Sequence, residues 1–132
     1  MLPRALWHYV AALYLAFQSL CAAFWWLLLL IEPRLRPYFR PSTTPDSALF
    51  AFFLPDVLLF IGAALWAMVL LIKRPQSARL PLVFHVGAAT YAALYCLAQT
   101  LLTGEAILAT ILMTICAFCA GYLAWKAAFS GE

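Results

Sequence analysis

Asp56 is the residue whose type and position point most clearly to chemistry. It lies inside a long apolar segment, Ser47–Ile72, directly after Pro55, and it is the one ionisable side chain in that segment. A carboxyl group within a membrane-spanning segment is energetically expensive, and such groups commonly bind a ligand or ion, relay protons or hydrogen-bond to a neighbouring helix. Asp56 is therefore the first candidate functional residue of this chain.

A second set of polar side chains follows one face of the apolar segment Pro81–Leu102. Spacings of three and four residues place them on one helical stripe, which comprises His85, Ala88, Ala92, Cys96, Gln99 and Thr103, with Tyr91 and Tyr95 beside it. A stripe of small and polar residues either packs against another membrane helix or lines a ligand cavity. In the second case, we expect a ligand-binding pocket lined by Asp56, Tyr95, Gln99 and Cys116.

Cys116 and Cys119 form a C-x-x-C pair inside the last apolar segment. A C-x-x-C in a fourth transmembrane helix resembles the vitamin K epoxide reductase family, and the resemblance implies a membrane thiol oxidoreductase. This chain departs from that family because its proline-rich outer loop has no cysteine pair that could pass electrons. A reactive thiol also needs an electropositive, partly exposed setting. We therefore interpret all four cysteines, including Cys21 and Cys96, as small packing residues.

The sequence contains no spacing typical of a metal or phosphate site. His8 and His85 belong to different apolar segments, and no carboxylate cluster accompanies either of them. Structural and catalytic metal sites need three or four such ligands close together. A glycine-rich phosphate loop is also missing from the sequence. We therefore predict no metal and no cofactor, and these residues leave open whether the protein is an enzyme.

The composition requires a membrane environment for most of the chain. Of its 132 residues, 67% are hydrophobic and 10% are charged, and the mean hydropathy is +0.97. Soluble domains have roughly 45–50% apolar and about 25% charged residues, so a water-soluble protein is excluded. The net charge of +3 is spread over short segments, and it therefore indicates membrane topology rather than a nucleic-acid partner.

Four apolar segments are long enough to span a bilayer, at about 20 residues each. The sequence predicts helices over about 6–31, 47–72, 81–102 and 106–125. The turn at Thr103, Gly104 and Glu105 is so short that the last two helices must be antiparallel neighbours. We predict a single all-α domain over 1–132, an integral membrane four-helix bundle with up-down topology and short loops.

Residues 32–46 form the one polar connection of any length. Four prolines prevent a helix from continuing through it, and Arg34, Arg36 and Arg40 alternate with apolar side chains. We predict an outer interfacial loop that lies along the lipid headgroups. We also predict that Trp7 and the Trp25–Trp26 pair mark the membrane interfaces.

The depth of Asp56 has two alternatives. If Asp46 or Ser47 begins one continuous helix, Asp56 lies roughly 14 Å below its start, and its carboxyl group needs a buried partner. If a new helix begins at Pro55, Asp56 lies in the first turn, where both proline and an acid are favourable. Residues 47–54 then form a separate segment, and Arg34 or Arg36 could reach Asp56.

Positive charge predicts the orientation of the chain. In a four-helix protein, the amino end, the connection between the second and third helices and the carboxyl end lie on one side of the membrane. The proline-rich loop lies on the other side. The shared side carries Arg4, Lys73, Arg74, Arg79 and Lys126, against Arg34, Arg36 and Arg40. Since cytoplasmic loops are enriched in such residues, we expect cytoplasmic termini, a plasma (inner) membrane location and an outer-half pocket. His85 is then expected near the inner headgroups.

The order of features also resembles the sterol-isomerase and sigma-2-receptor superfamily. The matching positions are Asp56 in the second helix, the basic turn at Lys73 and Arg74, and the proline-led third helix with Pro81 and His85. The resemblance implies a four-helix bundle that holds a hydrophobic ligand. This chain departs from that family in its shorter first loop, and helices three and four lack counterparts of the family's further acids.

Three functional hypotheses follow. In the first, a small polytopic membrane protein binds a lipid or isoprenoid-like ligand, or a partner membrane protein, within the bundle. In the second, a small dimeric proton-coupled transporter uses Asp56. In the third, a membrane thiol oxidoreductase uses Cys116 and Cys119. The expected partners are membrane lipid, a second copy of the chain or a larger membrane protein. If the bundle serves only for assembly, we expect it to have no internal cavity.

Overall fold

The computed structural model describes residues 3–129, which are helical almost throughout and include no strand. Four helical spans are long and apolar enough to cross a membrane, namely Ala5–Ile31, Asp46–Lys73, Pro75–Thr103 and Ile107–Ala128. They match the four predicted apolar segments. The chain is therefore an all-α protein whose composition indicates a multi-pass membrane protein.

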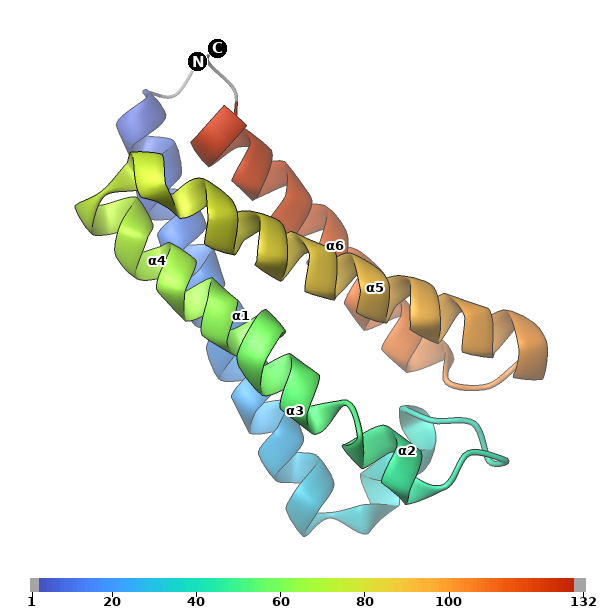
Figure 1. The fold of residues 1–132 in the computed structure, drawn as a ribbon. Helices are drawn as coiled ribbons and strands as arrows, with labels where there is room; N and C mark the ends of the chain where they lie inside the picture. Colours follow the sequence, from blue (N-terminus) through green and yellow to red (C-terminus); the bar gives the residue numbers. More distant parts are fainter. Residues whose placement is uncertain (1–2, 130–132) are drawn as a thin grey trace.

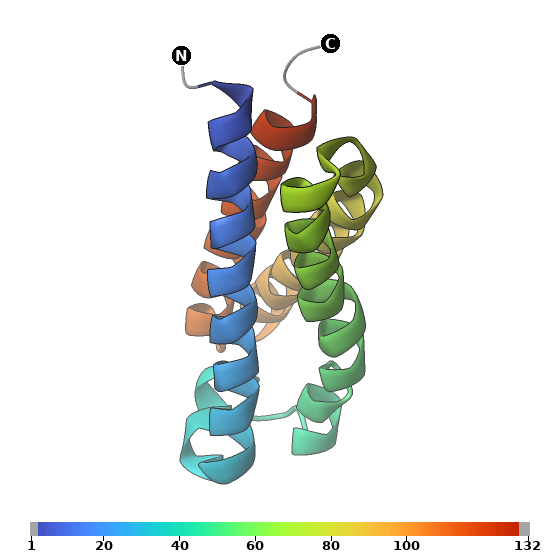
Figure 2. The ribbon, with the colours of Figure 1, turned by 90° about the vertical axis from the view of Figure 1, so that its left-hand side faces the viewer.

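The long helices form two pairs that diverge from a common end. Helix α1 (Arg4–Ile31) packs against α4 (Ala63–Lys73), and α5 (Arg79–Thr103) packs against α6 (Ile107–Ala124). The pairs lie close together near the start of α1 and the end of α6 and separate toward the other end (Figure 1), and in the view of Figure 2 the α5–α6 pair extends away behind α1 and α4. The polar connection and α2 (Asp46–Phe50) lie at the separated end.

Small side chains allow the close contact between α1 and α4. Ala64, Ala67 and Leu71 of α4 belong to one buried cluster with α1 residues that include Ala11 and Ala12. Alanine at such spacing lets two membrane helices approach closely, because association in lipid depends on packing rather than on hydrophobic burial. The alanines that follow Asp56 in the sequence therefore fix the distance between the first two spans.

A tight turn joins α5 to α6. Gly104 ends α5 with a φ of 71°, and its N–H donates to the carbonyl of Thr100 over 2.8 Å. Glycine adopts this left-handed conformation without steric cost. The hydroxyl groups of Thr100 and Thr110 lie 2.7 Å apart across the pair. The predicted antiparallel neighbours are confirmed.

The second span, Asp46–Lys73, is helical but is not one regular α-helix, which was the first of the two alternatives. The chain turns at residues 51 and 52, between α2 and α3 (Phe53–Pro55). Pro55 cannot donate a backbone hydrogen bond to the preceding turn, and Asp56 N–H donates to the carbonyl of Phe52 over 3.0 Å. Wider π-type turns follow in η2 (Asp56–Gly62) before α4 begins. The alternative with a separate segment before Asp56 is closer, although the new helix begins at Phe53.

The α1–α4 contact can be tested by enlarging one alanine. We expect Ala67→Leu to lower the unfolding free energy by about 1–3 kcal/mol, because Ala67 is fully buried and a larger side chain must push α1 away. Thermal unfolding in detergent would show a reduced Tm. The matched control is Ala98→Leu on the exposed face of α5, and an equal Tm for the two variants would contradict the close contact.

Candidate functional site

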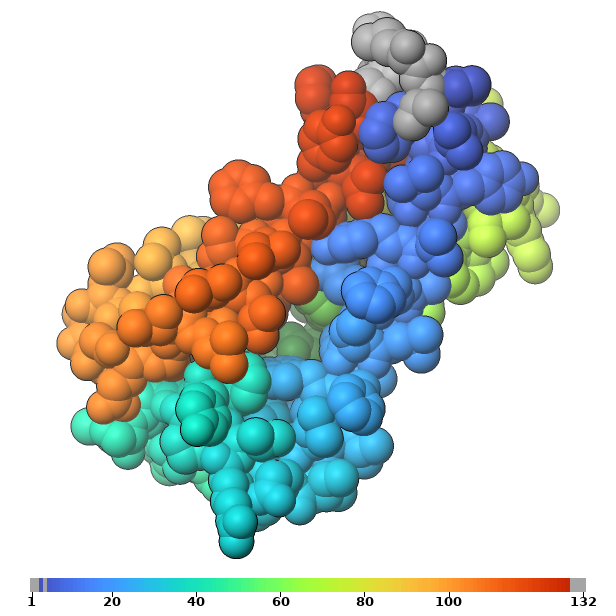
Figure 3. All heavy atoms as spheres, turned by 180° about the vertical axis from the view of Figure 1, so that it is seen from behind, coloured from blue at the N-terminus to red at the C-terminus, as the bar shows by residue number. Residues whose placement is uncertain are grey.

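A cavity of about 240 Å³ lies where the two helix pairs separate. All four helical spans and the polar connection contribute to its walls. The residues proposed from the sequence, Asp56, Tyr95, Gln99 and Cys116, all line it. Figure 3 shows the hollow from behind, between α1 in blue and the first half of α6 in orange, with atoms of the second span in green at its base. The fold therefore brings the four candidate residues together.

Asp56 has a tryptophan as its partner rather than an arginine. Trp26 of α1 is 2% exposed, and its Nε1–H donates to Asp56 Oδ2 over 3.1 Å. Trp26, predicted as an interfacial marker, therefore also has a structural contact. The alternative in which Arg34 or Arg36 reaches Asp56 is not observed, because Arg36 pairs with Asp46 over 2.7 Å and Arg34 lies 4.0 Å from Glu32. Among the described residues, Asp56 forms no ion pair. One aromatic N–H thus orients its carboxyl group at the cavity wall.

Tyr95 and Gln99 form a polar pair one helical turn apart on α5. Gln99 Nε2 donates to the hydroxyl of Tyr95 over 2.9 Å, and the ring of Phe52 lies against Tyr95 with ring centres 4.6 Å apart. The predicted stripe of small and polar residues on α5 faces hollow space at four positions, Ala88, Ala92, Cys96 and Gln99. Buried packing positions of α5 include Ala89 and Ala93, one residue further along. This half of α5 therefore has separate packing and cavity faces.

His85 is a buried polar residue whose partners the sequence did not reveal. It is fully buried, with Nδ1 2.8 Å from the carbonyl oxygen of Phe60 and Nε2 3.1 Å from Oε1 of Gln18. Gln18 is 4% exposed. One polar network therefore connects α1, η2 and α5. The signal in the sequence was Gln18, an uncharged polar residue near the middle of the first apolar segment.

Some hydrogen-bonding capacity along the cavity remains unused. The Nε1–H of Trp25 is buried without a partner among the described residues, and Trp25 lines the cavity. The amide nitrogen of Gln18, which also lines the cavity, is likewise buried without a partner among the described residues. Buried polar atoms are normally paired, with protein, water or ligand. The cavity walls are therefore mainly apolar, with an unused donor at Trp25 and an acceptor at Asp56.

The polar connection closes the separated end and supplies part of the cavity wall. Asp46 accepts from Arg36 over 2.7 Å and from Arg40 over 2.6 Å. Ser42 donates through its backbone N–H and its hydroxyl group to Glu105, at the turn between α5 and α6. Two of the three arginines expected along the headgroups are thus held by an aspartate. The connection folds back and links the two helix pairs.

The C-x-x-C pair is divided between the cavity and its surroundings. All four cysteines are free thiols. Cys21, Cys96 and Cys116 line the cavity, whereas Cys119 does not. The described residues contain no group of three His, Cys, Asp or Glu side chains that could hold a metal ion.

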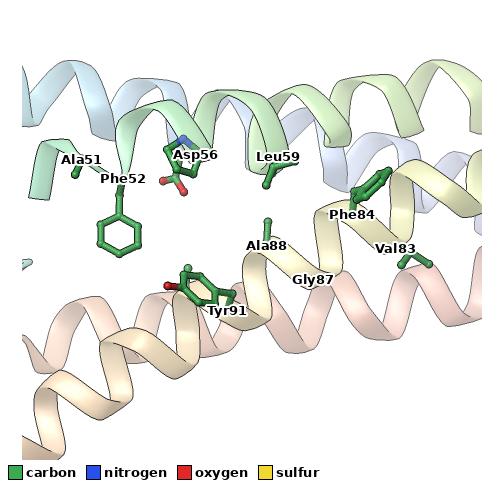
Figure 4. Close-up of a pocket in the computed structure, with 11 residues that line it drawn as sticks. Ala51, Phe52, Asp56, Leu59, Val83, Phe84, Gly87, Ala88 and Tyr91 are labelled. Carbon is green, nitrogen blue, oxygen red and sulfur yellow. The ribbon is translucent and has the colours of Figure 1, made fainter. Parts of the chain in front are cut away.

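A second hollow, of about 440 Å³, runs along the outer side of the gap between η2 and α5. Figure 4 shows Phe52, Asp56 and Leu59 on one side and Ala88 and Tyr91 on the other. We call it the outer groove. It shares Phe52, Asp56 and Ala92 with the inner cavity, so that these three residues separate the two spaces.

Comparison with protein families, with curated proteins and with solved structures found no match to this chain. The function must therefore be argued from the residues of the site.

The His85 network predicts a large loss of stability when the ring is made apolar. We expect His85→Phe to lower the free energy of unfolding by about 1–3 kcal/mol for each buried polar group that loses its partner. These groups are the side-chain amide of Gln18 and the backbone carbonyl of Phe60. Thermal unfolding in detergent would measure the loss, with Tyr91→Phe on the exposed side of α5 as the control. If the Tm of His85→Phe equals that of the wild type, the network does not hold the helices together.

The contact between Ser42 and Glu105 predicts a pH-dependent closure of the separated end. Hydrogen bonds from the Ser42 backbone and then its hydroxyl group hold the pKa of Glu105 below the ordinary value of 4.5. A lowered pKa stabilises the contact fully above the ordinary value, and the stabilisation is lost as the pH falls through the lower value in the folded protein. Amide exchange of residues 39–46, corrected for intrinsic rates, should accelerate in that window in the wild type. In Glu105→Gln the corrected rates should not change with pH, and a wild type that is equally flat would contradict the assignment.

Proposed function

We propose that this chain is a small polytopic membrane protein that holds a hydrophobic, lipid- or isoprenoid-like ligand within its bundle. The observation that carries the proposal is the shared cavity of Asp56, Tyr95, Gln99 and Cys116. Ligand sites are typically concave and mainly apolar, with a few convergent polar groups that fix orientation. A bundle that serves only for assembly would not need this hollow, so the cavity supports ligand binding over partner binding alone.

The proposal includes a membrane topology. We propose an up-down four-helix bundle with both termini in the cytoplasm, in a plasma (inner) membrane. The shared position of the termini in Figure 1 and the larger number of lysines and arginines at that end support this orientation. The cavity and the Asp46 ion pairs would then lie toward the outer side. Association with a second copy or with a larger membrane protein is part of the proposal.

A small dimeric proton-coupled transporter is the second candidate. The supporting observation is that Asp56 borders two separate spaces, the inner cavity and the outer groove. A carboxyl group that can be reached from two spaces could exchange a proton with a substrate. The thiol oxidoreductase hypothesis has less support, because only Cys116 of the C-x-x-C pair lines the cavity.

Native mass spectrometry of the detergent-extracted protein tests these alternatives. We expect the wild type to carry a bound lipid. We expect Asp56→Asn to bind this lipid with roughly ten- to a hundredfold lower affinity, which is the effect of losing a hydrogen bond to a charged group. Asparagine keeps an oxygen that can accept from Trp26, so that the fold should survive. Glu32→Gln is the matched control, because it makes the same chemical change away from both hollows.

The same spectra report the number of subunits. Lipid retained equally by wild type and Asp56→Asn would contradict a role for Asp56 in binding. A wild type without lipid, whose oligomer is lost in Asp56→Asn, would instead make Asp56 a contact between helices of an assembly. Dimers of the wild type that release protons on substrate addition would favour the transporter.

A further inference from the structure

The inner cavity is too small to enclose a lipid. Its volume of about 240 Å³ is below the range of about 300–1,000 Å³ that is typical of sites for drug-sized ligands. A lipid-like ligand bound there by its polar end must therefore extend out of the cavity.

The outer groove is the larger hollow next to it. Phe52, Asp56 and Ala92 line both spaces, so the two hollows are neighbours at Asp56, and movement of these side chains would join them. The groove is apolar along its length, with Leu59 on η2 and Val83 and Phe84 on α5. These three side chains are exposed in the described structure, as lipid-facing residues of a membrane helix would be.

Gly87 leaves part of this groove empty. A Cβ atom added at Gly87 would meet no atom within 4 Å, and the neighbouring groove positions Ala88 and Ala92 also have small side chains. Larger residues at these positions would fill the space between η2 and α5. The small residues keep the groove open to about 440 Å³.

The polar groups of the inner cavity favour a hydroxyl group. Asp56 can accept a hydrogen bond, whereas Trp25, on the wall of the same cavity, has an unpaired Nε1–H that can only donate one. A hydroxyl group serves both because it donates and accepts. An ammonium group has no acceptor for Trp25, and a carboxylate would face the carboxyl group of Asp56.

We propose that the ligand is a long-chain alcohol or a hydroxyl-bearing lipid whose hydroxyl group binds at Asp56 and whose hydrocarbon chain leaves through the outer groove. The inference rests on the proposed function and adds the chemical class of the ligand and the path of its chain. The inner cavity holds the hydroxyl group and the first few carbons. The remaining chain lies between η2 and α5, in contact with the bilayer.

Alkylation of the cavity thiols tests this arrangement. The rates at which N-ethylmaleimide labels Cys96 and Cys116 in the detergent-solubilised protein are followed by peptide mass, with Cys119 as the internal reference outside the cavity. The probes are hexan-1-ol, which fits the inner cavity alone, and hexadecan-1-ol, which does not. In the wild type we expect both alcohols to slow labelling of Cys96 and Cys116. Hexadecan-1-amine and hexadecanoate should need concentrations at least tenfold higher than hexadecan-1-ol to give the same protection.

Gly87→Leu fills the groove. We expect it to raise the concentration of hexadecan-1-ol needed for protection at least tenfold and to leave protection by hexan-1-ol unchanged. Ala88→Leu provides a second filled groove if Gly87→Leu does not fold. Thr90→Leu is the matched control, because it is an exposed position on α5 that lines neither hollow.

Each other outcome has a distinct meaning. If neither alcohol protects the wild-type thiols, the proposed ligand-binding function fails. If both alcohols protect and Gly87→Leu changes neither, ligand binding stands and the path through the groove is wrong. Loss of hexadecan-1-ol protection in Ala22→Leu, at the α1 side of the cavity, but not in Gly87→Leu would place the chain between α1 and α6 and overturn the path. Equal protection by the amine would overturn the preference for a hydroxyl group.

Discussion

The buried contact of His85 with Gln18 and the Phe60 carbonyl is the interaction on which the arrangement of the helices depends. It joins α5 to α1 and to η2. In lipid, helices gain little from hydrophobic burial, so polar contacts and close packing must hold them together. Beyond this network, the two helix pairs separate and the cavity begins. The network therefore fixes both the common end of the bundle and the inner end of the site.

Backbone irregularity in the second span sets the position of Asp56. Pro55 cannot complete the helical hydrogen bonds, the chain turns before it, and the wider turns of η2 follow. Irregular backbone at membrane depth is tolerated where protein covers it or where it lines a cavity. Here Phe52 and Asp56 from this irregular part line both hollows. The break thus brings a carboxyl group to the cavity from a span that would otherwise be a regular helix.

The number and length of the spans and the tight turn at Gly104 could be predicted, because length, hydrophobicity and turn chemistry act locally. The four candidate residues could be proposed because polar groups in apolar segments are few. The partner of Asp56 could not, because Trp26 also fits an interfacial position, and only the crossing of α1 and η2 brings it within 3.1 Å. The partners of His85 could not be predicted for a related reason, since distance from a helix start gives depth but not which neighbour covers a side chain.

Asp56 has a different electrostatic setting from Asp46 and Glu105. Asp46 neutralises two arginines, and Glu105 accepts two hydrogen bonds at an exposed turn. Each of those carboxyl groups completes a contact that closes the separated end of the bundle. Asp56 receives one hydrogen bond from Trp26, and a carboxylate has acceptor sites for several more. If its only role were to join α1 to η2, an amide or hydroxyl group could accept the same bond at a lower desolvation cost. Asp56 lines both hollows, so a ligand hydroxyl group bound there would supply a further donor to this unused acceptor capacity.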